Sequence, residues 1–244
     1  MARFPNNFGN GLTSQPLGYA TPADEMTIST FFNAVYAWMA AGLALTGVIA
    51  FVVANRPDLL PFQLTGGTFL ILFVLQLLLV VSISGAINRI GPAAATALFL
   101  LYAALNGVTF SVLFKAYSLP SLTSAFLVTA GTFGAMSIYG YTTRRDLTRF
   151  GSLFFAALIG IVIASVVNIF LHSPMLYWLV SYGGVILFIA LTAYDTQVLK
   201  IIAAQSAGNP RMASRMAIVG SLRLYLDFIN LFLFILRIMG NRRN

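Results

Sequence analysis

Long, uninterrupted runs of apolar residues dominate the chain from about residue 28 to residue 239, and short polar segments with Gly, Pro, Asn or Asp separate them. Each run is long enough to cross the hydrocarbon core of a bilayer as a helix, which takes about 20 residues. None shows the strict alternation expected of a lipid-facing barrel strand. The pattern therefore predicts an all-α integral membrane protein, a bundle of seven transmembrane helices. The runs cover residues 28–54, 66–87, 92–114, 121–141, 150–171, 175–199 and 217–239.

The two ends of the chain differ from this transmembrane domain, residues 28–239. Residues 1–27 are polar and rich in Gly, Asn and Pro, and the first apolar run is too long for a cleavable signal sequence. We therefore expect residues 1–27 to form a disordered cytoplasmic tail. Residues 240–244 form a short basic tail.

Composition narrows the class further. The chain has 244 residues, of which 59% are hydrophobic and only 8% are charged, whereas soluble domains carry about 25% charged residues. Cysteine is absent, which excludes disulfides, thiolate metal sites and thiol catalysis. The net charge of +8 indicates membrane topology and lipid contact, not nucleic-acid binding.

The basic residues predict the orientation, because they gather on the cytoplasmic side of membrane proteins. With a cytoplasmic N-terminus, eight lie inside and five outside. A re-entrant last helix would give 11 against 2, but residues 217–239 are long enough to cross, so we prefer seven full spans. We interpret the longest connection, residues 200–216, as a basic cytoplasmic loop. The inner set is Arg3, Arg89, Arg144, Arg145, Arg149, Lys200, Arg211 and Arg215, and the outer set is Arg56, Lys115, Arg237, Arg242 and Arg243.

Several amides lie inside the predicted helices. They are expected to form interhelical hydrogen bonds, or else to line a polar path. Asn106 and Asn230 are the candidates for a cation pathway. The full set is Asn33, Gln76, Asn106, Asn168 and Asn230.

Two of the six acidic residues, Asp195 and Asp227, lie within predicted membrane helices. A carboxylate at the centre of such a helix costs about 2.5–3.5 kcal/mol even on insertion-based scales, so these residues are functional candidates. If the last helix enters the hydrocarbon near Leu222, the two acids reach a similar depth, whereas entry at Ala217 would separate them. We favour the first register, in which Arg223 can extend to the interface.

Two carboxyl groups within hydrogen-bond reach cannot both ionise cheaply, so they would titrate as a unit. A shared proton would hold the helices together, and its loss would separate them or offer oxygen ligands to Ca²⁺. The structural alternative is a set of ordinary ion pairs. In it, Asp227 would pair with Arg223 at i,i+4, and Asp195 with Arg89 or Lys200.

Several stretches resemble the Bax inhibitor-1 family, also called the transmembrane Bax inhibitor motif family. They are Tyr194-Asp195-Thr196-Gln197, Leu224-Tyr225-Leu226-Asp227-Phe228-Ile229-Asn230-Leu231-Phe232 and Leu101-Tyr102-Ala103-Ala104-Leu105-Asn106-Gly107. Their order along the chain makes the match, which runs from about residue 29 to residue 243. The short loops are similar to those of bacterial members, which implies a bacterial inner membrane.

The resemblance implies a seven-helix fold with the last helix at its centre, and a pH-sensitive Ca²⁺ leak gated by an aspartate pair. The pair falls on Asp195 and Asp227, which would be both the pH sensor and the Ca²⁺ ligands. The family's latching arginine of the second helix has Arg89 as its nearest counterpart. Arg223 is a departure, because an uncharged residue is expected there.

We expect a transport role and no enzyme activity or cofactor, with Ca²⁺, protons and the lipid bilayer as partners. The single histidine, His172, lies at a predicted turn, so a serine protease lacks its base. No Gly-x-Gly-Asp surrounds Asp227, as an intramembrane aspartyl protease would require, and no buried lysine could hold retinal. Two alternatives stay open: a non-transporting regulator of another membrane protein, such as a protease, and a proton-coupled cation exchanger.

Overall fold

The computed structural model describes residues 22–56, 58, 66–86, 90–206 and 208–241. This described part is almost entirely helical and contains no strand. Its elements are α1 (Pro22–Asn55), α2 (Gly66–Ala86), α3 (Pro92–Ala116), α4 (Leu119–Thr142), the 3₁₀ turn η2 (Thr148–Phe150), α5 (Gly151–Leu171), α6 (Pro174–Gln205) and α7 (Pro210–Met239).

The helices agree closely with the apolar runs. Six of them are long and apolar enough to span a membrane, and α2 has a shorter apolar stretch, Gly66–Ser82, among the residues searched. Proline stands in the first turn of α3, α4, α6 and α7, where its missing N–H costs no hydrogen bond. The all-α membrane architecture predicted from the sequence is therefore confirmed.

The prediction that residues 200–216 form a loop is wrong, because most of them are helical. α6 continues to Gln205, and α7 begins at Pro210, where the Asn209 side chain accepts a hydrogen bond of 3.0 Å from the Met212 amide. Residues 201–204, which follow Lys200, are again apolar, so the single lysine does not end the helix.

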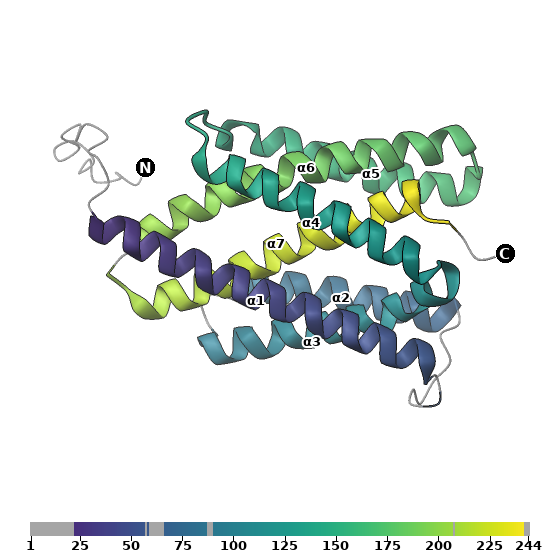
Figure 1. The fold of residues 1–244 in the computed structure, drawn as a ribbon, viewed down its shortest axis with the longest axis horizontal. Coiled ribbons are helices and arrows are strands. Elements are labelled where there is room, and N and C mark those ends of the chain that lie inside the picture. The colour runs from purple at the N-terminus through teal and green to yellow at the C-terminus, as the bar shows by residue number, and fades with distance from the viewer. Residues whose placement is uncertain (1–21, 57, 59–65, 87–89, 207, 242–244) are drawn as a thin grey trace, which may run out of the picture.

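The predicted tails lie mostly outside the described residues. α1 begins at Pro22, within the segment expected to be a tail, and residues 1–21 and 242–244 are not described. The start of α1 and the end of α7 lie at opposite ends of the long axis of the bundle (Figure 1).

α7 packs against α1, α3, α4 and α6, whereas α5 packs mainly against α6. The buried Tyr225 of α7 ties three helices together. Its hydroxyl lies 2.7 Å from Thr46 Oγ1 of α1, which donates a second hydrogen bond of 2.8 Å to the Ala103 carbonyl of α3. This polar link at the middle of the bundle fixes α7 to α1 and α3, and leaves its opposite face to α6.

Candidate functional site

Asp195 of α6 and Asp227 of α7 lie at the contact between these two helices, with their carboxyl groups within hydrogen-bond reach of each other. Both are buried, with 8% and 5% of their surfaces exposed. This places the acids at the same level of the bundle, as expected if α7 enters the hydrocarbon near Leu222. Residues 28 positions or more apart in sequence thus form one acidic site.

Arg223 completes the site. Its Nη1 donates to Asp195 Oδ1 over 3.2 Å, while nearly half of its side chain stays exposed. The structural alternative expected Arg223 to pair with Asp227, one turn along its own helix. Arg223 instead forms its ion pair with Asp195 on the neighbouring helix. Long arginine side chains bury their aliphatic part and keep the charged end near the interface.

The second expected ion pair, between Asp195 and Lys200, is also absent from the described residues. Lys200 Nζ instead donates to the Tyr141 carbonyl of α4 over 2.9 Å and stacks over the Tyr141 ring. Arg89, the candidate latch of the second helix, lies outside the described residues.

The neighbouring threonine hydroxyls donate their hydrogen bonds to backbone carbonyls and not to the two acids. The hydroxyls of Thr192 and Thr196 are fully buried, but each donates to a carbonyl one turn earlier on α6, over 2.7 Å. Within the described residues, Asp227 Oδ2 is buried without a hydrogen-bond partner. The acidic site thus depends on the two carboxyl groups themselves and on Arg223.

The two candidate pathway amides donate along their own helices. Asn106 Nδ2 bonds to the Tyr102 carbonyl over 3.1 Å, and Asn230 Nδ2 to the Leu226 carbonyl over 2.8 Å. Neither of these hydrogen bonds joins a second helix. By contrast, Gln76 of α2 donates to Thr109 Oγ1 of α3 over 2.8 Å, the interhelical role expected of such residues.

A resident metal centre finds no support in the described residues, which hold no cluster of three or more His, Cys, Asp or Glu side chains. Ca²⁺ takes six to eight oxygen ligands. The two aspartates alone cannot supply them, so a cation at this site would also need carbonyl oxygens or water.

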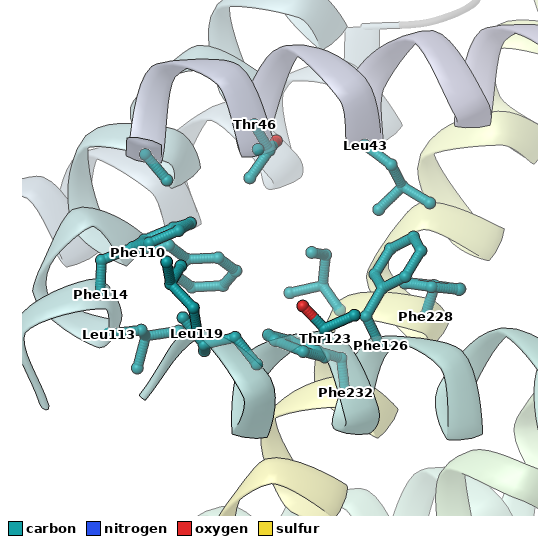
Figure 2. A pocket seen from close by; sticks show the side chains of 14 residues that line it. Leu43, Thr46, Phe110, Leu113, Phe114, Leu119, Thr123, Phe126, Phe228 and Phe232 are labelled. Atoms are coloured by element: carbon teal, nitrogen blue, oxygen red, sulfur yellow. The ribbon is translucent and has the colours of Figure 1, made fainter. Parts of the chain in front are cut away.

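Two cavities meet at Phe228, the residue after Asp227. An apolar cavity of about 260 Å³ lies between α1, α3, α4 and α7, and Figure 2 shows the phenylalanine rings around it. A second, of about 540 Å³, lies between α1 and α4 and includes Asn33 and Ser137 in its wall. Phe228 lines both, and its ring packs 5.5 Å from the centres of Phe126 and Phe133. The sequence pattern did not indicate this aromatic contact.

Comparisons with known proteins show which sequences this chain is similar to. Residues 28–244 match the family model described as "Inhibitor of apoptosis-promoting Bax1". The "Inner membrane protein YbhL" of Escherichia coli is 50% identical over 218 residues, which cover 88% of this chain and 93% of the relative. A protein of Borreliella burgdorferi is 45% identical over 88% of this chain and 93% of its own length. One of Deinococcus radiodurans is 45% identical over 89% and 92%.

Proposed function

We propose, from the premise that the chain belongs to the Bax inhibitor-1 family of membrane proteins, that it is a pH-sensitive passive Ca²⁺ leak channel of a bacterial inner membrane. The observation that carries the proposal is the buried contact between the Asp195 and Asp227 carboxyl groups, with Arg223 bound to one of them. Two acids that face each other in a low-dielectric setting hold one proton between them more readily than none.

The charges of the three side chains explain why one proton decides the state. With Arg223 charged and one carboxyl protonated, the site is neutral, and a neutral group of side chains is the least costly to keep among membrane helices. Loss of the proton leaves two carboxylates against a single guanidinium. The repulsion between the acids then favours separation of α6 from α7, and the freed oxygens attract a cation.

In this proposal Arg223 acts as a latch from within the last helix. It holds Asp195 across the helix contact in the closed form, a role that the family resemblance gives to an arginine of the second helix. Arg89 would then strengthen the closed form without being its only cation. The two arginines make separable contributions, which single and double substitutions can measure.

The proposal includes seven full crossings, a cytoplasmic N-terminus and a central last helix. The opposite positions of the start of α1 and the end of α7 support an odd number of crossings (Figure 1). The packing of α7 against four other helices supports its central place. The arginines of the α4–α5 turn and of the start of α7 favour a cytoplasmic location for that end.

Ca²⁺ flux into proteoliposomes, measured across a range of pH, tests the proposal. The wild-type leak should rise as the pH rises through the titration of the pair. In Asp227→Asn, the amide keeps the hydrogen-bonding shape but cannot lose a proton, so the rise should shrink from about tenfold or more to about twofold or less. Asp58→Asn, at an exposed ion pair with Arg56, is the matched control.

Both results bear on the claim. A pH profile of Asp227→Asn that coincides with the wild-type profile, in protein that elutes as a single folded species, would refute gating by the pair. Equal leaks for all divalent cations would replace a Ca²⁺ channel with a non-selective pore. Proton counter-transport in a fixed ratio would make the protein an exchanger.

A further inference from the structure

The turn between α4 and α5, residues 143–150, carries a concentration of positive charge that the acidic site does not use. Three arginines, Arg144, Arg145 and Arg149, lie within residues 144–149, and all three are exposed. Arg149 pairs with Asp146 over 3.7 Å. Arg144 and Arg145 have no ion-pair partner in the described part of the chain. Two guanidinium groups are thus available to an outside anion.

The position of the turn indicates which anion it meets. α4 and α5 are both candidate membrane spans, so the turn that joins them lies where the bilayer ends. None of the α5 span is buried in the protein, so this helix faces outward except along its contact with α6. Phe150, which directly precedes α5, is also exposed. Free arginines at this level would therefore meet lipid headgroups, and guanidinium groups bind phosphate oxygens with two parallel hydrogen bonds.

The turn holds a fixed shape through its own hydrogen bonds. The Arg145 amide donates to Thr143 Oγ1 over 3.2 Å, and the Thr148 amide donates to Asp146 Oδ1 over 3.0 Å. The hydrogen bonds from Thr148 lower the pKa of Asp146, so this carboxylate keeps its cap well into the acid range. A turn that is already ordered loses little entropy when its arginines bind a ligand.

One side chain connects this turn to the acidic site. Gln197 Oε1 accepts a hydrogen bond of 2.7 Å from the Leu147 amide, and Gln197 Nε2 donates to the Arg145 carbonyl over 2.8 Å. Gln197 lies two residues after Asp195 on α6. The neighbouring Tyr194 packs its ring 5.5 Å from that of Phe154 on α5. The turn and α6 are therefore held in a fixed relation just where α6 presents its carboxyl group.

We propose that the α4–α5 turn binds the headgroups of anionic phospholipids through Arg144 and Arg145, and that Gln197 transmits this binding to Asp195 on α6. Headgroup binding would hold the turn at the membrane surface and, through Gln197, hold α6 in the position in which Asp195 meets Asp227. Anionic lipid would then stabilise the closed form and move the opening of the leak to higher pH. The second half of this inference rests on the proposed function, and the first half does not.

Lipid binding is tested without any flux assay. Purified protein is mixed with vesicles of phosphatidylcholine, with or without phosphatidylglycerol, and the lipids that stay bound are counted by native mass spectrometry. The wild type should retain phosphatidylglycerol over phosphatidylcholine, and the preference should weaken as salt rises. R144Q/R145Q should lose most of this preference, because the substitutions remove both guanidinium groups. The turn should keep its shape, because Gln197 bonds only to its main-chain atoms.

R56Q is the matched control, because Arg56 is an exposed arginine at the end of α1 and lies beside Asp58. It should keep the wild-type preference. Equal loss in R56Q and R144Q/R145Q would reduce the effect to overall charge and overturn the docking surface. No preference for phosphatidylglycerol in the wild type would overturn it directly, whatever the variants do.

The coupling is tested with Q197L, which removes both hydrogen bonds and keeps a similar volume. Q197L should still bind phosphatidylglycerol, but the pH midpoint of its Ca²⁺ leak should no longer depend on that lipid, whereas the wild-type midpoint should shift. A lipid-dependent midpoint in Q197L would overturn the coupling. If the wild type carries no Ca²⁺ at any pH, the leak proposal fails, and the infrared band of the protonated aspartate, with and without phosphatidylglycerol, then decides the coupling.

Discussion

α5 and α7 are both apolar helices long enough to cross a membrane, yet they occupy opposite environments. None of the α5 span is buried in the protein, whereas 61% of the α7 span is. α5 is also the more apolar of the two, and α7 carries Asp227, Arg223 and Tyr225. The more apolar helix is therefore the one that faces lipid, and the less apolar helix lies inside.

This difference shows what hydropathy measures in a membrane protein. Lipid tails are as apolar as leucine, so burial among helices gains no hydrophobic free energy, and close packing and hydrogen bonds must hold the buried helix in place. Polar side chains on α7 find partners on α1 and α6, whereas the outward face of α5 has no neighbouring helix among the described residues to supply them. A polar residue in an apolar run thus points to the inside of the bundle and to function.

The largest difference in stability between the two helices is expected when an aromatic residue on each is replaced by alanine. Tyr225→Ala on α7 removes a fully buried ring and its link to Thr46, so the free energy of unfolding in mild detergent should fall by about 3 kcal/mol or more. Phe155→Ala on α5 removes a ring that is 64% exposed and should change it by well under about 1 kcal/mol. Equal losses would contradict the assignment of the two environments.

Glycine substitutions extend the contrast between tightly packed and outward-facing helices to α4 and α5, with a single methyl group as the probe. Gly140 of α4 lies so close to the Ala193 backbone of α6 that a Cβ atom could not fit without movement, whereas Gly160 of α5 has open space around it. Gly140→Ala should lower the unfolding free energy by about 1–3 kcal/mol, and Gly160→Ala should be neutral or slightly stabilising. Thermal unfolding of the pair side by side provides the measurement. A stable Gly140→Ala would show that α4 and α6 are less tightly packed.

Removing the charge of Arg223 sharpens the comparison at the acidic site. Arg223→Gln leaves Asp195 without its cation, so the free energy of unfolding at neutral pH should fall by about 1 kcal/mol. This value is modest because nearly half of the arginine side chain is exposed. The leak should also open at lower pH. Arg237→Gln, near the end of the same helix, serves as the control. A leak profile unchanged in Arg223→Gln would remove Arg223 from the latch.

The smallest expected effect is at the turn that begins α5. Because the pKa of Asp146 is lowered in the folded protein, its stabilising contribution is present above the carboxyl's unfolded-state pKa and is lost as the pH falls through the folded-state value. Asp146→Asn should therefore lower the thermal stability slightly at neutral pH, where the carboxylate contributes, and leave it unchanged in acid, so that the loss of stability in acid becomes shallower. A larger change at neutral pH would point to a structural role for Asp146 beyond its cap on Thr148.

The sequence predicted the helices because their limits depend on local chemistry. α3 begins at Pro92 and α7 ends at Met239, both as predicted. Proline marks the start of a helix and the end of the apolar run marks the end of one, and both signals are local in the sequence. The predicted loop at residues 200–216 was wrong because α6 continues past Lys200 through the apolar residues 201–204, and α7 begins at Pro210, before its apolar run starts. A helix can extend through residues that are not apolar, and hydropathy does not report that extension.

The site was only partly predictable for a related reason. Asp195 and Asp227 could be selected from the sequence because charge within an apolar run is costly. The partner of Arg223 could not, because it depends on how α6 and α7 are rotated about their axes, and an i,i+4 pair is equally consistent with the spacing. The Gln197 contact with the α4–α5 turn was equally hidden, since it joins residues 50 or more apart.

The central claim is that Asp195 and Asp227 share one proton, and infrared spectroscopy of the purified protein as a function of pH tests it most directly. We expect one protonated-carboxyl band that disappears as the pH rises over the same range in which the leak opens. Asp195→Asn and Asp227→Asn should each abolish or displace that single band. Two independent bands, each lost in only one variant, would contradict the account.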